Sequence, residues 1–202
     1  MRYLDRRKHY ESLLKTVEVS EHWIPEIKKV LDRIEESVIH YKIISHEIRV
    51  PWEVLATLHY LECNGDFTRH IHNGDSLNDR TVRVPRGRPI NPPKPPVVLK
   101  DSTKYPYTFF ESCTDWAELK RANISLAQLY EWCDESILYF LEANNGFGYV
   151  NKGVETPYLW SGTNHYEGGK YVQDGIFDET TVSQQVGAVP LLLYLKGLNE
   201  YS

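Results

Sequence analysis

The sequence predicts a single α+β domain, 1–202, that is mainly helical. Several segments repeat apolar residues at helical spacing, with charged residues between them. Two other segments, 63–84 and 144–177, are instead rich in Gly, Asn, Asp and aromatic side chains. With 202 residues the chain is long enough to bury one core without disulfides. We expect 1–49 to support a functional core at 50–195.

The composition argues against several classes of protein. With 23 Lys and Arg against 28 Asp and Glu, the net charge of −5 disfavours nucleic acid as a partner, because such binders usually present a basic face. No apolar run is long enough to span a membrane, and the charged N-terminus lacks the apolar stretch of a Sec signal. The three cysteines fit no metal or redox spacing. We therefore expect a monomer made in the cytoplasm, with no cofactor and no metal.

Two helices are expected before residue 50. The first, 3–19, places four apolar residues on one side, namely Leu4, Leu13, Leu14 and Val17. Ser20 is an N-cap candidate for the second helix, and Pro25 is tolerated near its first turn. The apolar stripe of this second helix consists of Ile27, Val30, Leu31, Ile34 and Val38.

A third helix is expected to begin near Pro51, which is a favourable first residue. It runs through WEVLATLHYLE and ends at Cys63, because Asn64 and Gly65 can adopt the left-handed conformation that ends helices.

The next segment, 63–84, is expected to be a small β-hairpin or an irregular β region. Asn73-Gly74 is a turn signal, and the sequence TVRV at 81–84 alternates like a strand. Six prolines at 85–96 then predict an extended, ordered loop.

Helices are expected to return near Thr114 and at Ser125. Ser125 and Gln128 form a capping-box pattern, and the helix that follows reaches Ala143. Its buried face consists of Leu126, Leu129, Cys133, Ile137, Phe140 and Leu141.

The C-terminal part begins with a segment rich in glycine. Seven of the twelve glycines lie between 146 and 175, interleaved with aromatic residues. A last helix is expected after Asp178, an N-cap candidate, and Pro190 should kink or break it.

Glu62 is the candidate catalytic residue. It falls on the same helical stripe as Leu55 and Leu58, in the last turn of the third helix. Apolar surroundings and the negative end of the helix dipole both disfavour a carboxylate there, so we expect a raised pKa. A protonated carboxyl group near neutral pH is what cleavage of a glycosidic bond requires. The alternative is an ordinary helix-end glutamate, turned to solvent or paired with an arginine.

A glycosidase of this kind often needs a second carboxylate near the acid. Asp75 is the first choice, because the tight turn at 72–75 can return the chain over Glu62, and Asp79 is the reserve. Asp66 lies too near the helix end to fold back easily. The alternative for Asp75 is a plain Asx turn.

Two segments together resemble a lysozyme-like family of phages and bacteria, within the superfamily of goose-type lysozymes, soluble lytic transglycosylases and chitosanases. They read LHYLECNGDFTRHIHNGDSLNDRTVRVPRGRP and NNGFGYVNKGVETPYLWSGTNHYEGGKYVQDGIFD. The resemblance covers 50–195. It implies a lysozyme-like fold, mainly helical with a small β region after the catalytic helix, and cleavage of β-1,4 linkages in amino-sugar polymers, usually peptidoglycan.

The resemblance also implies roles for residues near the third helix. Glu62 matches the catalytic acid of the family, and the turn that contains His72, Asn73 and Asp75 matches the loop that faces it. Cys63 departs from the family, because many relatives have Ser after the catalytic glutamate.

A second loop is implied by the later segment. Asn145 and Gly146 begin a stretch similar to the Tyr-Asn-Gly loop that lines the cleft of lytic transglycosylases. Asn144 departs from this pattern, since those enzymes have Tyr there.

Aromatic and amide side chains are expected to bind the sugar rings, because pyranose C–H faces stack on aromatic rings and amides bond N-acetyl groups. The candidates are Tyr149, Trp160, Asn164 and Tyr166. The alternative is a glycine-rich loop held by buried aromatic residues. Thr81 is a candidate to position the attacking water, and its alternative is an ordinary β-branched strand residue.

The expected function is a peptidoglycan hydrolase of the muramidase type, with a lytic transglycosylase or a chitosanase-like glycosidase as the alternative. A usable second carboxylate favours attack by water over attack by the sugar's own 6-hydroxyl group. Without a Sec signal, the enzyme would act at the cell wall after release or export.

Other classes of protein stay open at this point. A weak zinc motif consists of His70, His72 and Asp75 with a distant His59 or His165. A non-catalytic glycan-binding module would keep the aromatic residues without a buried acid. A purely structural or interaction protein would have no open cleft beside the acid.

Overall fold

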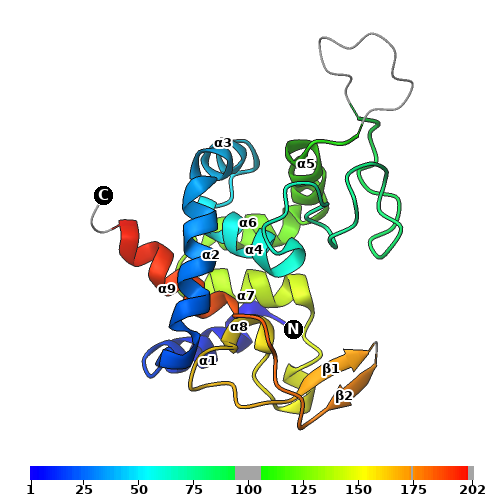
Figure 1. The fold of residues 1–202 in the computed structure, drawn as a ribbon. Helices are drawn as coiled ribbons and strands as arrows, with labels where there is room; N and C mark the ends of the chain where they lie inside the picture. Colours follow the sequence, from blue (N-terminus) through cyan, green and yellow to red (C-terminus); the bar gives the residue numbers. More distant parts are fainter. Residues whose placement is uncertain (94–105, 174, 200–202) are drawn as a thin grey trace. The chain divides into compact units, whose positions relative to one another are not determined.

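The chain forms two compact units, which Figure 1 shows in a computed structural model. The structure describes residues 1–93, 106–173 and 175–199. Unit 1 consists of Met1–Ser37 and Ser125–Ser202, and unit 2 consists of Val38–Ile124. The described residues are mainly helical and contain one two-stranded sheet, in agreement with the predicted α+β class.

Unit 2 is built mainly from three helices, and a long connection separates the second of them from the third. They are α3 (Val38–Ile48), α4 (Trp52–Cys63) and α5 (Phe109–Leu119). α3 packs against both α4 and α5. α3 therefore belongs to the same unit as α4, although it lies in the stretch 1–49 that was expected to support the core.

The helix α4 has the boundaries that the sequence predicts. Pro51 is its N-cap, and Asn64 ends it in the left-handed conformation with a φ of 53°. Residues 54–60 are buried on every side of the helix, including the polar Thr57 and His59. A helix buried all round has no single apolar stripe, so the position of Glu62 relative to Leu55 and Leu58 does not by itself decide its surroundings.

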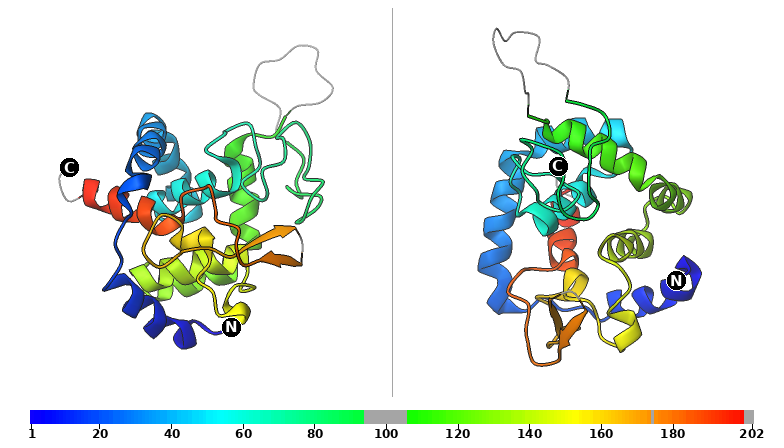
Figure 2. Two further views of the ribbon diagram at one scale, coloured as in Figure 1. Left: turned by 60° about the horizontal axis from the view of Figure 1, so that its bottom comes forward. Right: turned by 90° about the vertical axis from the view of Figure 1, so that its right-hand side faces the viewer.

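The segment 64–93 follows α4 and forms no strand among its described residues. It contains one isolated β-bridge, between Arg69 and Ser76. Figure 2 draws this segment as irregular coil. The strand predicted at 81–84 is wrong, because the N–H groups of Val82 and Arg83 donate to the carboxylate of Asp75 instead of to a partner strand.

Unit 1 contains the remaining helices and the sheet. Its elements are α1 (Tyr3–Leu14), η1 (Glu21–Trp23), α2 (Ile24–Glu36), α7 (Asp134–Asn145), η2 (Val150–Lys152), α8 (Pro157–Trp160), β1 (Lys170–Gln173), β2 (Ile176–Asp178) and α9 (Ala188–Asn199). α1 packs on α7, α7 on α8, and α9 on both α8 and α2. The two strands are antiparallel, with Tyr171 opposite Phe177.

The buried face of α1 differs from the predicted one. Leu4, expected on the apolar side, is 65% exposed, and the buried residues are Tyr3, Arg6 and Tyr10. Arg6 and Tyr10 are buried because they bond to Glu142 of α7. The polar partner therefore decides which side of the helix is buried.

The second predicted helix is two helices. α2 carries Pro25 in its first turn, as expected, but it ends at Glu36. Val38, expected on the same stripe, begins α3. Ser20 precedes η1 without a side-chain cap bond.

The helices of the second half also differ in their boundaries. α5 begins before Thr114, at a capping box formed by Thr108 and Glu111. Ser125 lies inside α6 (Arg121–Leu129) rather than at a cap. The predicted helix to Ala143 is broken after α6, where Glu131 and Trp132 have φ values of 53° and 52°.

The last helix starts later than expected. Asp178 ends β2, where its side chain accepts hydrogen bonds from Thr180 and Thr181. α9 begins at Ala188, so Pro190 lies in its first turn, where it does not interrupt the helix.

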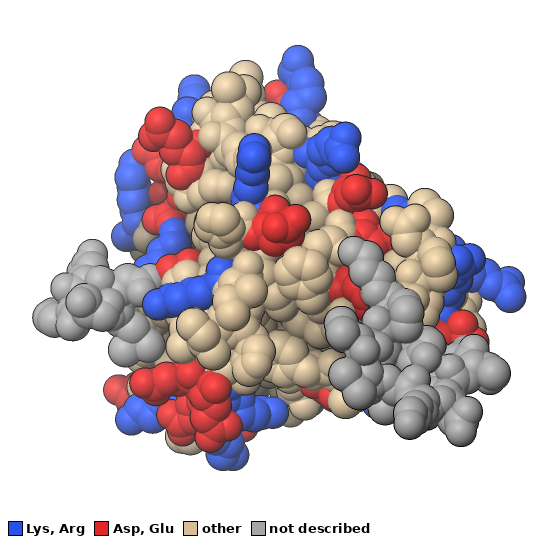
Figure 3. Space-filling model, turned by 90° about the horizontal axis from the view of Figure 1, so that it is seen from above, with Lys and Arg blue, Asp and Glu red and all other residues tan. Residues whose placement is uncertain are grey.

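Two further predictions concern membranes and the proline-rich loop. No helix among the described residues is long and apolar enough to cross a bilayer. On the face drawn in Figure 3, basic and acidic side chains are intermixed.

Of the proline-rich stretch 85–96, Pro95 and Pro96 lie outside the described residues.

Candidate functional site

Glu62 lies in the last turn of α4, next to the C-cap residue Asn64 and its neighbour Gly65. Its residue is half-buried, whereas residues 54–60 of the same helix are buried. Glu62 therefore lies where a helix that is buried along most of its length reaches the surface. A rigid element of this kind can hold a catalytic group in place.

The turn after α4 returns to the backbone of Glu62. The added Cβ of an alanine at Gly74 would lie 2.9 Å from the carbonyl oxygen of Glu62, and Gly74 has a φ of 73°. Only glycine satisfies both conditions, because it has no side chain and tolerates positive φ. The structure thus places the 72–75 turn against the residue that the sequence selects as the acid.

The neighbouring Cys63 fastens the same turn to the helix. Its thiol donates to the carbonyl oxygen of His70, at 3.1 Å. Burial, with a smaller contribution from the charge of Glu62, raises the pKa of the Cys63 thiol to about 12. The thiol therefore stays protonated at neutral pH and keeps its hydrogen for this bond.

Lys120, which the sequence did not single out, interacts electrostatically with Glu62. Burial lowers the pKa of Lys120, and the negative charge of Glu62 partly offsets this lowering. Lys120 follows α5 directly as its C-cap. A cation favours the charged form of a nearby carboxylate, which opposes the effects of the helix dipole and of burial.

Asp75 is held by three hydrogen bonds. Its Oδ2 accepts from the backbone N–H groups of Val82 (2.8 Å) and Arg83 (3.0 Å), and its Oδ1 accepts from Arg83 Nε (2.6 Å). Burial raises the pKa of Asp75, but the bonds from Arg83 and Val82 outweigh burial and lower it to about 2. A carboxylate with so low a pKa is a weak base. These bonds favour the role of a loop anchor over that of a general base, and Asp75 as second catalytic carboxylate stays a prediction.

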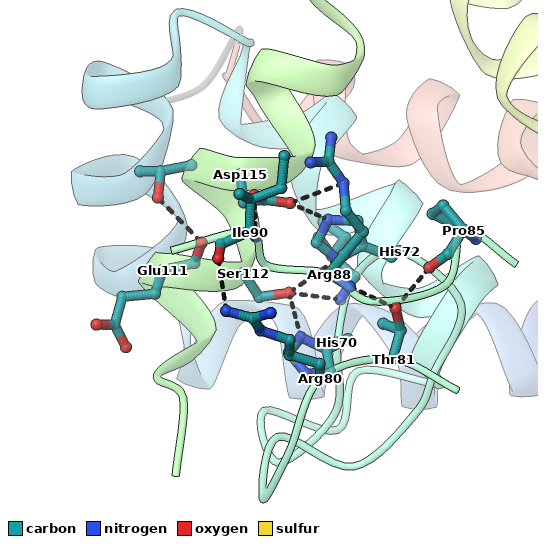
Figure 4. A network of polar contacts seen from close by, with 12 residues as sticks. His70, His72, Arg80, Thr81, Pro85, Arg88, Ile90, Glu111, Ser112 and Asp115 are labelled. Atoms are coloured by element: carbon teal, nitrogen blue, oxygen red, sulfur yellow. Dashed lines mark hydrogen bonds and ion pairs between the residues drawn. The ribbon is translucent and has the colours of Figure 1, made fainter. Parts of the chain in front are cut away.

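His72 belongs to a buried polar network that joins the 66–90 segment to α5, shown in Figure 4. Its Nε2 donates to Asp115 Oδ2 (2.9 Å), and its Nδ1 lies 3.3 Å from Ser112 Oγ. The other ends of the network are Arg88, whose Nε lies 3.3 Å from Asp115 Oδ2, and His70, whose Nδ1 lies 3.0 Å from Ser112 Oγ. These contacts fix the segment that follows α4 to the helix α5.

Ser112, His72 and Asp115 share residue types with a hydrolase triad, but their surroundings differ. Ser112 is fully buried, and its hydroxyl also accepts from the N–H of Ile71 at 3.2 Å. Burial lowers the pKa of His72 to about 4, so its ring is neutral at pH 7. The nucleophile of a triad must reach its substrate, so this cluster is structural, and a sugar-binding role for His72 is not supported.

The side chains of Thr81 and Asn73 also form hydrogen bonds with the main chain of residues 83–88. The hydroxyl of Thr81 donates to the carbonyl of Pro85 and accepts from the N–H of Arg88. The Asn73 amide donates to the carbonyls of Arg83 (3.1 Å) and Val84 (3.3 Å). Thr81 is 2% exposed, which leaves no room for the water-positioning role expected of it.

The aromatic candidates of unit 1 are buried. Trp160 is 0% exposed, while Tyr149 and Tyr166 are each 8% exposed. The Tyr149 hydroxyl accepts from the N–H of Tyr171, and the Tyr166 hydroxyl donates to the carbonyl of Gly169. Stacking on a sugar needs an exposed ring face, so the structure favours the alternative of a glycine-rich segment held by buried aromatic residues.

The polar candidates of unit 1 differ among themselves. Asn164 uses its amide to bond the backbone at Thr16 (2.9 Å) and Glu18 (3.0 Å), which is a structural role. Asn145 is exposed at the end of α7, and Gly146 is the C-cap with a φ of 94° and open space around it. Asn145 and Gly146 therefore stay candidates for contact with a ligand.

The histidines of the suggested zinc motif do not converge. No group of three or more His, Cys, Asp and Glu side chains is arranged to hold a metal among the residues described. His70 donates to the carbonyl of Asp79 at 2.8 Å, and His59 Nδ1 lies 2.8 Å from the Tyr41 hydroxyl. His165 Nε2 donates to the carbonyl of Leu13.

Unit 1 contains a hollow of about 340 Å³ that the sequence did not predict. Its walls are mainly aliphatic, with Leu14, Ile137, Leu138 and Leu192 among them. At its rim Lys196 forms an ion pair with Asp134. The hollow contains none of the predicted site residues.

A second helix-end glutamate, Glu142 of α7, was missed by the sequence analysis. It is 1% exposed and accepts from Arg6 Nη2 (3.1 Å) and from the Tyr10 hydroxyl. Burial raises the pKa of Glu142, against the opposing effects of Tyr10 and Arg6. The signal that could have found it is the recurrence of Leu-Glu before Asn-Gly, at 61–65 and again at 141–146.

Comparisons with models of protein families, with curated proteins and with solved structures gave no match. The geometry of the two units is thus the basis for the functional proposal.

Proposed function

We propose that the protein is a peptidoglycan hydrolase of the muramidase type, a lysozyme-like glycosidase in which Glu62 is the general acid. The observation that carries the proposal is the placement of this carboxyl group. Residue 62 is half-buried in the last turn of a helix whose residues 54–60 are buried, and the turn through Gly74 packs on the backbone of Glu62. The resemblance of both sequence segments to lysozyme-like enzymes supports the same reading.

In the proposed reaction, Glu62 protonates the oxygen of a β-1,4 glycosidic bond as that bond breaks. Positive charge develops on the sugar ring, and the carboxylate left on Glu62 stabilises it. A water molecule then adds to the anomeric carbon and gives a proton to the Glu62 carboxylate, which completes hydrolysis and restores the acid. Lys120 limits how strongly the acid holds its proton, because a nearby cation favours the ionised carboxylate. The 72–75 turn keeps the acid in position through Gly74 and the Cys63 thiol.

A lytic transglycosylase is the second candidate, and the hydrogen bonds of Asp75 favour it. Hydrolysis needs a group that activates water, and the carboxylate of Asp75 already accepts from three donors. In lytic transglycosylation the sugar's own 6-hydroxyl group attacks the anomeric carbon, so no water has to be positioned. A non-catalytic glycan-binding module is less well supported, because the aromatic residues expected to bind sugars are buried.

The proposed substrate is peptidoglycan or a related amino-sugar polymer. We place the activity at the cell wall, which the protein would reach after release or export. No nucleic acid takes part in the proposed function.

Digestion of purified peptidoglycan tests the proposal. The parent protein should release muropeptides, and mass spectrometry should show reducing ends for hydrolysis or 1,6-anhydro ends for transglycosylation. Glu62→Gln should lower the rate about a thousandfold, because it removes the acid proton. Glu47→Gln is the matched control, since Glu47 is an exposed glutamate of α3 in the same unit. No turnover by the parent protein would overturn the proposal.

A further inference from the structure

The segment 82–87, called here the valine–arginine loop, exposes apolar side chains in a fixed position. Val82 is 70% exposed and Val84 is 88% exposed. Arg83 and Arg86 alternate with them, and both are exposed. Single exposed apolar residues are common, so the backbone that holds these two decides whether they matter.

One side of the valine–arginine loop is held by the turn at 73–75. The Asp75 carboxylate accepts from the backbone N–H groups of Val82 and Arg83, and the Asn73 amide donates to the carbonyls of Arg83 and Val84. Four main-chain groups of residues 82–84 are therefore bound by side chains that the turn supplies.

Thr81 and its neighbours close the other side of the loop. The N–H of Gly87 donates to the carbonyl of Thr81 (2.8 Å), and the N–H of Thr81 donates to the carbonyl of Arg88 (2.7 Å). The Thr81 hydroxyl bonds both Pro85 and Arg88. A loop held in this way presents its side chains without an ordering cost for the backbone on binding, which is one condition for a preorganised contact surface.

The charge of the loop contrasts with the charge of the chain. Arg86 forms no ion pair with any residue that the structure describes, and Arg83 is 63% exposed although it pairs with Asp75. The whole chain carries −5. Cationic side chains between exposed valines suit a ligand that combines carboxylates with small alkyl groups.

The loop also lies close to the proposed acid. The point where a Cβ would stand on Gly74 is 2.9 Å from the carbonyl oxygen of Glu62 and 3.9 Å from Arg83 Nη2. Arg83 and the backbone of Glu62 therefore flank the same glycine. A glycan strand bound at Glu62 would carry its substituents past this loop.

We propose that the valine–arginine loop binds the lactyl-peptide substituent of peptidoglycan and so selects peptide-bearing strands. The inference rests on the proposed function. Methyl groups of the lactyl and alanyl units fit Val82 and Val84, while stem-peptide carboxylates fit Arg83 and Arg86. Chitin lacks both features, and chitosan is a polycation that the arginines repel.

The test compares intact peptidoglycan with the same glycan strands stripped of peptides by an amidase. Val84→Ser and Arg86→Gln should each lower the ratio of initial rates, peptide-bearing over stripped, by about tenfold. Ile43→Ser is the control, because Ile43 is an exposed aliphatic residue of α3 (58%) in the same unit, and it should leave the ratio unchanged. Equal falls on both substrates, or no fall, would overturn the inference.

Co-sedimentation with the two polymers separates this inference from the proposed function. Glu62→Gln protein should bind intact peptidoglycan about tenfold more tightly than stripped strands, and Val84→Ser should remove the difference. If the parent protein cleaves neither polymer, the proposed function fails while the binding difference still tests the loop. Equal binding to both polymers would refute the loop assignment even if the enzyme is active.

Discussion

The helices α4 and α7 end in nearly the same sequence, LECNG at 61–65 and LEANNG at 141–146, yet their glutamates differ. Glu142 is 1% exposed and bonded to Arg6 and Tyr10 of α1. Glu62 is half-buried, and the turn through Gly74 packs on its backbone. The shared sequence therefore places a glutamate at a helix end in both cases. The element that packs on that end decides whether the glutamate is buried.

The largest expected effect on stability is at Glu142. Glu142→Ala leaves the Arg6 guanidinium and the Tyr10 hydroxyl buried without the acceptor that they share, so the free energy of unfolding should fall by about 4 kcal/mol. Chemical denaturation measures this change. The folded fraction should keep the activity of the parent protein, and a loss of activity matching that of Glu62→Gln would break the comparison.

Gly74→Ala tests the contact between the turn and Glu62. Positive φ and the 2.9 Å approach to the Glu62 carbonyl should together lower the free energy of unfolding by about 3 kcal/mol. Gly65→Ala is the matched control, since Gly65 has a φ of 72° and nothing within 4 Å of an added Cβ. The control should cost only about 1 kcal/mol. Equal losses for the two variants would show that the contact with Glu62 contributes nothing.

The two units should also differ in how strongly acid destabilises them. Burial lowers the pKa of His59 and of His72 to about 4, so their neutral forms stabilise unit 2 fully above pH 6.5 and less as the pH falls towards 4. Asp75, with a pKa near 2, adds a further loss between about pH 4 and pH 2. The raised pKa of Glu142 acts the other way, because protonation relieves its burial.

Hydrogen exchange between pH 7 and pH 4 measures this difference unit by unit. Protection in α4 and α5 should fall, and it should fall more than protection in α1 and α7. His72→Gln should flatten the pH dependence of unit 2. An equal fall in the two units would contradict the assignment of the buried histidines.

The smallest expected effect is at Lys120. Lys120→Met removes the cation that interacts with Glu62, so the acid should keep its proton to a higher pH. The alkaline limb of the pH–rate profile should move up by up to about one pH unit. Lys42→Met is a control lysine in the same unit, placed over the Trp52 ring. A limb that does not move would exclude Lys120 from tuning the acid.

The elements that could be predicted from the sequence are those whose boundaries are set by residues close to them in the chain. α4 was predicted with its end, because Asn64-Gly65 is a self-contained stop signal. The buried face of α1 was not, because Arg6 and Tyr10 are buried by Glu142, more than 130 positions away. The strand at 81–84 failed for the same reason, since the carboxylate of Asp75 takes the N–H groups that a partner strand would use.

The candidate site shows the same limit. The position of Glu62 and the return of the 72–75 turn were predictable from spacing and turn residues. Lys120 and the contacts of His72 with Ser112 and Asp115 were not, because they join segments about forty to sixty positions apart through tertiary packing. The aromatic residues of unit 1 were misassigned, since composition does not distinguish a buried ring from an exposed one.

The central claim is that the carboxyl group of Glu62, and not that of Glu142, performs the acid chemistry. The most direct measurement is the rate of muropeptide release from purified peptidoglycan by Glu62→Gln and Glu142→Gln, each corrected for its folded fraction. We expect a loss of about a thousandfold for Glu62→Gln and little change for Glu142→Gln. Full activity in Glu62→Gln would contradict it.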